Sequence, residues 1–236
     1  TLQNYIWIGC MLITIYSLYL IFRFQSYENR YLTCLIMSIG LFVLYNSFYI
    51  TGVTIPRLPI QLCNLACYLL LVAIVFKIKP LFDFTLIANV VGTIIAILVP
   101  DINYGIFSFF HFHFLYEHMM VLIIPIVMMV LRIFPRPDLK ALRNSLIGFA
   151  IYFVFCWTTG TYLNSISSRT GYTVNYFYIF KDEIVQVFGF LAPLRNWKLV
   201  VGDHTGYPIY QFVVFLGFSG FCVAFYYVLK YFIKLI

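Results

Sequence analysis

Long apolar runs separated by short polar segments dominate the chain. A helix needs about 20 mostly apolar residues to cross a bilayer, and backbone groups in lipid must bond within their own segment. The runs do not alternate between apolar and polar residues, as the strands of a membrane barrel would. We therefore predict an all-α polytopic membrane helix bundle with about seven transmembrane helices, over residues 6–22, 31–50, 58–76, 81–99, 106–134, 145–163 and 209–236.

The longest connection between two runs covers residues 164–208. It contains two apolar and aromatic stretches, 176–180 and 184–191, which Lys181, Asp182 and Glu183 separate. Because Tyr and Trp favour the membrane–water interface, we expect an ordered extracytoplasmic cap with an interfacial or re-entrant helix. We find no repeat and no soluble domain, so residues 1–236 should form a single transmembrane domain.

Composition and charge support a membrane protein. The chain is 63% hydrophobic and 10% charged, whereas soluble domains carry about 25% charged residues. The net charge of +7 would suggest a nucleic-acid partner in a soluble protein, but here Lys and Arg lie in short loops, so we expect no nucleic acid. Ten of the 15 Lys and Arg residues fall on one side of the predicted bundle. The positive-inside rule then places the N-terminus outside and the C-terminus inside, in a multi-pass cell-membrane protein.

Strongly polar residues interrupt the apolar runs at specific places. Gln61, Cys63 and Asn64 lie near the start of the third run, and a histidine-rich segment from His111 to His118 lies in the fifth. Polar residues are costly in lipid, so each is a candidate for function. In the predicted orientation they share the outer third of the bilayer with three residues at the ends of other runs, namely Asn46, Asp101 and Asn164.

Helix geometry divides the fifth run into two polar faces. His111 and His118 are seven residues apart, or about two turns, and share one face. His113 and Glu117 are four residues apart and share another. We therefore expect the imidazoles to point in at least two directions.

Three chemistries fit this set of residues. Cys63 could be a nucleophile that a histidine activates, with Gln61 or Asn64 donating to an oxyanion. Cys63 and Cys67 could bind Zn²⁺ with two histidines, although their spacing is not the usual one. The polar layer could also be a transport pocket or a proton relay. Simpler interpretations exist, because a buried Cys commonly only packs and Asp101 could cap the next helix.

Four segments resemble a known family. They are LPIQLCNLACYLL at residues 58–70, VVGTIIAILVPD at 90–101, FFHFHFLYEHMMVLIIP at 109–125 and GTYLN at 160–164. Together they resemble the YwaF-like bacterial integral membrane family, which is related to the eukaryotic transmembrane protein 164. The long connection departs from the shorter bacterial pattern.

The resemblance implies an intramembrane acyltransferase or transacylase that acts on membrane phospholipids, with Cys63 and His118 as the catalytic pair. We expect no cofactor and no metal, and the sequence leaves the oligomeric state open. The alternative is a non-catalytic protein that binds or transports a lipid or a small amphiphile. The remaining residues of the polar layer are assigned to substrate or oxyanion binding, namely Gln61, Asn64, His111, Asp101, Asn46 and Asn164.

Overall fold

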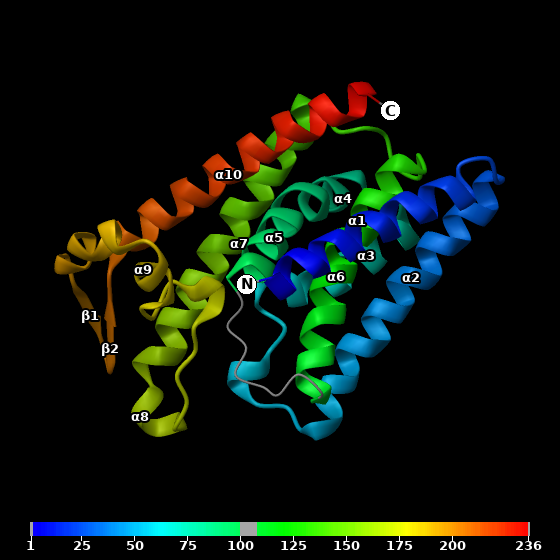
Figure 1. Ribbon diagram of the computed structural model, residues 1–236. Coiled ribbons are helices and arrows are strands. Elements are labelled where there is room, and N and C mark those ends of the chain that lie inside the picture. The colour runs from blue at the N-terminus through cyan, green and yellow to red at the C-terminus, as the bar shows by residue number, and fades with distance from the viewer. Residues whose placement is uncertain (1, 100–107, 236) are drawn as a thin grey trace.

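A computed structural model describes residues 2–99 and 108–235 of the chain as a helical bundle (Figure 1). Its helices are α1 (Leu2–Phe22), α2 (Tyr27–Ser47), α3 (Leu62–Phe76), α4 (Lys79–Phe84), α5 (Val90–Leu98), α6 (Phe109–Val130), α7 (Leu139–Ser165) and α10 (Pro208–Leu235). A π-helical segment, η3 (Thr85–Asn89), joins α4 to α5 without a break. The predicted all-α architecture is confirmed.

Five helical stretches in the described chain are long and apolar enough to cross a membrane, namely Tyr27–Ile50, Lys79–Leu98, Phe109–Val130, Leu139–Ser165 and Pro208–Ile233. Two further apolar helices are shorter, Ile6–Phe22 and Leu62–Phe76. These stretches correspond to the seven apolar runs. The number of helices that cross the bilayer, and their orientation, stay predictions.

Local sequence explains where several helices begin. Ser26 accepts a hydrogen bond from the Asn29 amide at 3.2 Å, and Asp138 accepts one from the Ala141 amide at 2.8 Å. Ser108 does the same for the His111 amide at 3.1 Å. Each side chain satisfies an amide that a helix start leaves unpaired, so these polar residues define the first turns of α2, α7 and α6.

Helix α3 is shorter than the predicted span 58–76, because residues 58–61 are not helical. Its 15 residues extend about 22 Å, less than the roughly 30 Å of a hydrocarbon core. Two short 3₁₀ turns, η1 (Phe48–Thr51) and η2 (Ile55–Arg57), precede it. Non-helical backbone is tolerated at membrane depth only where it is buried in protein or lines a cavity. We therefore expect other parts of the chain to supply hydrogen-bond partners for the backbone before α3.

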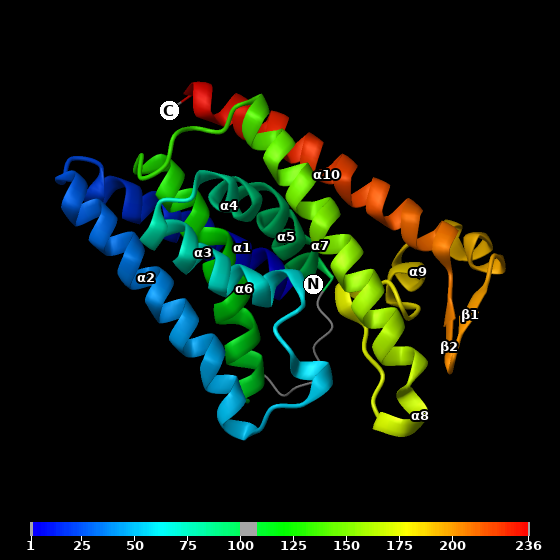
Figure 2. The same cartoon turned by 180° about the vertical axis from the view of Figure 1, so that it is seen from behind.

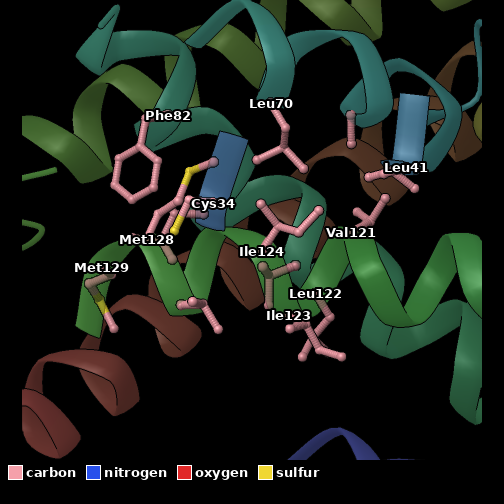
Figure 3. Packing of buried hydrophobic residues seen from close by; sticks show 14 of the residues in the cluster. Cys34, Leu41, Leu70, Phe82, Val121, Leu122, Ile123, Ile124, Met128 and Met129 are labelled. Atoms are coloured by element: carbon pink, nitrogen blue, oxygen red, sulfur yellow. The ribbon is translucent and has the colours of Figure 1, made fainter. Parts of the chain in front are cut away.

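Two hydrophobic clusters fill the bundle. The first joins α1, α2, α3, α4 and α6, and Figure 3 shows its centre around Leu70, Phe82 and Ile124. The second joins α7 and α10 to η3, α5 and the long connection. Figure 2 shows α7 and α10 running side by side along one flank, with α3 to α6 between them and α2. The α3–α5 region therefore belongs to both halves of the core.

The connection between α7 and α10 is ordered. Instead of a single interfacial helix it contains α8 (Ser167–Thr170), η4 (Tyr176–Tyr178), α9 (Glu183–Val187), η5 (Gly189–Asn196) and an antiparallel hairpin of β1 (Leu199–Val201) and β2 (His204–Gly206). Gly202 turns the hairpin at a φ of +57° and lies against the Ser165 carbonyl at the end of α7. The hairpin is thereby docked onto the bundle.

Candidate functional site

The start of α3 places Cys63 in the first helical turn. Gln61 occupies the N-cap position without making a side-chain cap, so the first amides of the helix are not consumed by it. The Cys63 thiol donates a hydrogen bond to Asn64 Oδ1 at 3.2 Å. A helix N-terminus carries partial positive charge, so this position suits a thiolate.

Side chains from two other elements support this helix start. The Tyr152 hydroxyl of α7 donates to the Ile60 carbonyl at 2.9 Å, and Asn89 Nδ2 of η3 donates to the Leu62 carbonyl at 2.6 Å. Asn89 is fully buried, and its Oδ1 has no hydrogen-bond partner among the described residues. The sequence analysis missed Asn89, although a strongly polar residue in the apolar run 81–99 was the available signal. π-helical segments such as η3 often occur at functional sites.

Helix α6 carries a buried carboxyl group. Glu117 is 4% exposed, and its Oε1 has no hydrogen-bond partner among the described residues. Its Oε2 lies 3.7 Å from Nδ1 of His113, which is 5% exposed. Nε2 of His113 lies 3.3 Å from the Tyr45 carbonyl of α2. Residues of α2 and α6 therefore form one buried polar cluster.

His118 is also buried, at 4% exposure. Its Nδ1 donates to the Phe114 carbonyl at 2.8 Å, and its ring stacks on that of Phe114 with centroids 4.0 Å apart. Its Nε2 has no hydrogen-bond partner among the described residues, and within them no hydrogen bond joins His118 to Cys63. The Cys63–His118 pair therefore stays a prediction.

Gln61 and Asn164 both hold the long connection. Gln61 donates through Nε2 to the Asn175 carbonyl at 3.0 Å and accepts from the Phe177 amide at 2.9 Å. Asn164 donates to the Val174 carbonyl at 3.0 Å and accepts from the Val174 amide at 2.8 Å. The structure thus brings these two predicted residues to one end of the bundle. There their side-chain amides are already hydrogen-bonded to backbone groups, and these bonds would have to break before either side chain could bind substrate.

The other predicted residues have varied surroundings. Asn46 donates to the Phe42 carbonyl at 2.8 Å and accepts from the Tyr68 hydroxyl at 2.9 Å, so its amide is well occupied. His111 is 8% exposed, and neither ring nitrogen has a partner in the part of the chain that the structure describes. Asp101 lies outside the described residues.

The described chain offers no group of three or more His, Cys, Asp or Glu residues arranged to hold a metal ion. A surface hollow of about 540 Å³ is lined by Arg132, Ile133, Phe134, Pro135 and Arg136. It lies beyond the end of α6, whereas the histidines lie in its first half. The buried polar cluster is therefore separate from this hollow.

Comparison with known proteins gives one result for the whole chain. The model of the TMEM164 family matches residues 1–229. No curated protein and no solved structure matches the chain significantly.

Proposed function

This chain belongs to the TMEM164 family, and we propose that it transfers acyl chains between phospholipids within the cell membrane. Cys63 is the nucleophile and His118 a catalytic base. The observation that carries the proposal is the position of Cys63, a thiol in the first turn of a helix whose N-cap residue makes no side-chain cap. The partial positive charge of a helix N-terminus favours the thiolate form of a cysteine.

In the first half-reaction, the Cys63 sulfur attacks the carbonyl carbon of a phospholipid ester. A C–S bond forms, the ester C–O bond breaks, and the lysolipid leaves with a proton. The free amides at the start of α3 and the Asn64 side chain supply donors for the oxyanion that develops, which is commonly among the largest contributions to acyl transfer. The product is a Cys63 thioester.

In the second half-reaction, the hydroxyl of a lysolipid attacks the thioester and releases the thiolate. The hydroxyl must lose a proton, and His118 is suited to accept it. Because a carbonyl can only accept, Nδ1 of His118 carries the proton that bonds to Phe114, and Nε2 of the neutral ring holds a free lone pair. The predicted orientation places this chemistry in the outer leaflet.

The test is acyl-enzyme formation. Protein in phospholipid nanodiscs is denatured, and its intact mass and the peptide that contains Cys63 are examined for an acyl adduct that hydroxylamine removes. We expect the adduct in the wild type and in the control Cys10→Ala, which alters an exposed thiol. We expect none in Cys63→Ala. An adduct that persists in Cys63→Ala, or a wild type that is never acylated, would reject the mechanism, and retained lipid binding without any adduct would favour a binding or transport protein.

A further inference from the structure

The surface hollow beyond α6 contains two basic side chains and no acidic one. The residues that line its 540 Å³ are Arg132, Ile133, Phe134, Pro135 and Arg136. Helix α6 is long and apolar enough to cross a membrane, and it ends at Val130. A hollow that begins directly after such a helix is expected at the depth of the lipid head groups, where the anionic groups of a membrane lie.

Contacts to two other helices fix the floor of the hollow. Phe134 is 5% exposed and stacks on Phe82 of α4, with the ring centroids 4.2 Å apart. Arg30 of α2 donates through Nη1 to the Leu131 carbonyl at 2.7 Å, which holds the end of α6. The hollow is therefore formed before any ligand arrives, and a preformed site binds at a lower cost in ordering.

The two guanidinium groups keep most of their donors free. Each carries five N–H donors. Arg136 uses Nη1 for a 3.4 Å contact to the Ile233 carbonyl, where the connection after α6 passes the C-terminal end of α10 (Figure 1). The side chain of Arg132 has no hydrogen bond and no ion pair within the described residues. Because arginine binds phosphate oxygens through two parallel N–H bonds, both side chains are suited to a phosphate group.

The backbone of Arg132 is independent evidence that its side chain is needed. Its φ is +60°, in the left-handed region that glycine adopts without steric cost. The Arg132 amide donates to the Met129 carbonyl at 3.1 Å, and the Ile133 amide donates to the Met128 carbonyl at 2.8 Å. Helices that end with these two bonds commonly have glycine at this position. The helix dipole favours a basic residue anywhere in the last turn, so it explains the charge but not the strained position.

Helix α3 ends in the same way at the same end of the bundle. Lys77 follows it with a φ of +54°. The two neighbouring residues Tyr31 and Arg30 of α2 join these helix ends, because Tyr31 donates to the Ile74 carbonyl at 3.3 Å and Arg30 to the Leu131 carbonyl. Two helices therefore place a basic residue where glycine would be less strained, both on the side predicted to be cytoplasmic.

We propose that the hollow binds the phosphate of one anionic phospholipid, with Arg132 and Arg136 as its ligands. No carboxylate lines the hollow to balance the two positive charges, so a head group with a net negative charge complements it. The cationic amine of a zwitterionic head group would instead meet the second arginine. Ile133 and Phe134 supply apolar contacts for the glycerol backbone of the lipid. Because the histidines lie in the first half of α6, this site is separate from the acyl transfer proposed above.

Lipid binding to the purified protein in detergent tests the site. Native mass spectrometry follows titrations with phosphatidylglycerol and with phosphatidylcholine of the same acyl chains. We expect the wild type to bind one phosphatidylglycerol at least about tenfold more tightly than phosphatidylcholine. A basic residue near anionic lipid contributes about fivefold in affinity, so Arg132→Gln/Arg136→Gln should bind phosphatidylglycerol roughly 30-fold more weakly. The matched control Arg23→Gln/Lys140→Gln removes two exposed charges outside the hollow and should change the affinity less than about twofold.

Arg132→Gly distinguishes a ligand-binding role from a structural one. Glycine relieves the positive φ, so the melting temperature measured without lipid should rise by a few degrees. Binding of phosphatidylglycerol should nevertheless weaken about fivefold. Arg132→Lys keeps the charge but loses the two-pronged contact, so its affinity should lie between those of wild type and Arg132→Gly. A fall of the melting temperature in Arg132→Gly would show that the arginine is kept for the fold and would count against the site.

Three results would overturn the proposal. One is equal affinity of the wild type for the two lipids. Another is a loss of affinity in Arg23→Gln/Lys140→Gln as large as that in Arg132→Gln/Arg136→Gln, which would indicate a general attraction by the basic end of the bundle. The third is full displacement of phosphatidylglycerol by millimolar inorganic phosphate, which would assign the hollow to free phosphate. None of these results affects the thioester test, which concerns Cys63 alone.

Discussion

Replacement of Asn164 by alanine should release the long connection from the end of α7. Asn164 is 5% exposed and makes two hydrogen bonds to the backbone of Val174, which is 2% exposed. The substitution leaves a buried amide and a buried carbonyl without partners, and each costs about 1–3 kcal/mol. Because the structure around these two groups can relax, we expect the free energy of local opening to fall by about 2–4 kcal/mol in total. Since about 1.4 kcal/mol is a factor of ten, the open population should rise roughly 30- to 700-fold.

Hydrogen exchange measures this opening at the bond itself. The Val174 amide donates to Asn164, so its exchange rate reports the loss directly. The Phe177 amide, which donates to Gln61, reports whether the release spreads toward α3. The control Asn29→Ala removes an exposed side-chain amide of α2 that bonds to Gln25, and it should leave both rates unchanged. If the Val174 amide exchanges equally slowly in Asn164→Ala and in wild type, the connection is held by other contacts and the reasoning is wrong.

Two further predictions concern the same connection. Gly160→Ala should lower stability by about 1–3 kcal/mol in a detergent melting experiment, because the added Cβ would overlap the Phe180 ring, whereas Gly9→Ala, with no atom within 4 Å, should raise it by about 0.5–1 kcal/mol. Hydrogen bonds from Ser168, first from its side chain and then from its amide, hold the pKa of Asp203 below its ordinary value. Charged Asp203 therefore favours the docked hairpin above the ordinary Asp pKa, and this gain is lost as the pH falls through the lowered pKa. In the wild type, the exchange rate of the Ser168 amide should rise at low pH by more than the intrinsic pH dependence of amide exchange. In Asp203→Asn it should follow the intrinsic dependence alone. Equal acid sensitivity in the two proteins would contradict this prediction.

The helices were predictable because length and apolar content are local properties. Each apolar run corresponds to a helix, but the capping side chains at residues 26, 108 and 138 start three of these helices at other positions than the predicted 31, 106 and 145. The start of α3 was predicted too early. Pro56 and Pro59 were the signal that helix was disfavoured there, but the apolar residues around them continued the pattern of the run.

The site was only partly predictable, because its contacts join distant parts of the chain. The common membrane depth expected for Gln61 and Asn164 stays a prediction, and their partners at residues 174–177 lie in a connection whose path no periodic pattern describes. The hairpin was missed for a similar reason. Strands of three residues are too short for alternation to be recognised, and only Gly202 marked the turn.

The interruption before α3 is what places Cys63 at a helix start. Had residues 58–76 formed one helix, the amides of Cys63 and Asn64 would bond to the carbonyls four residues earlier, those of Pro59 and Ile60. Because the first bond of α3 instead runs from Leu65 to the Gln61 carbonyl, those two amides lie in the first turn, where an α-helix supplies no partner.

Such a break is costly inside a membrane unless other groups replace the lost bonds. Tyr152 does so for the Ile60 carbonyl, Asn89 adds a hydrogen bond to the Leu62 carbonyl, and Gln61 ties the break to the connection. These polar side chains from three separate elements therefore have a common effect. They stabilise a helix start within the bundle, and Cys63 lies in its first turn.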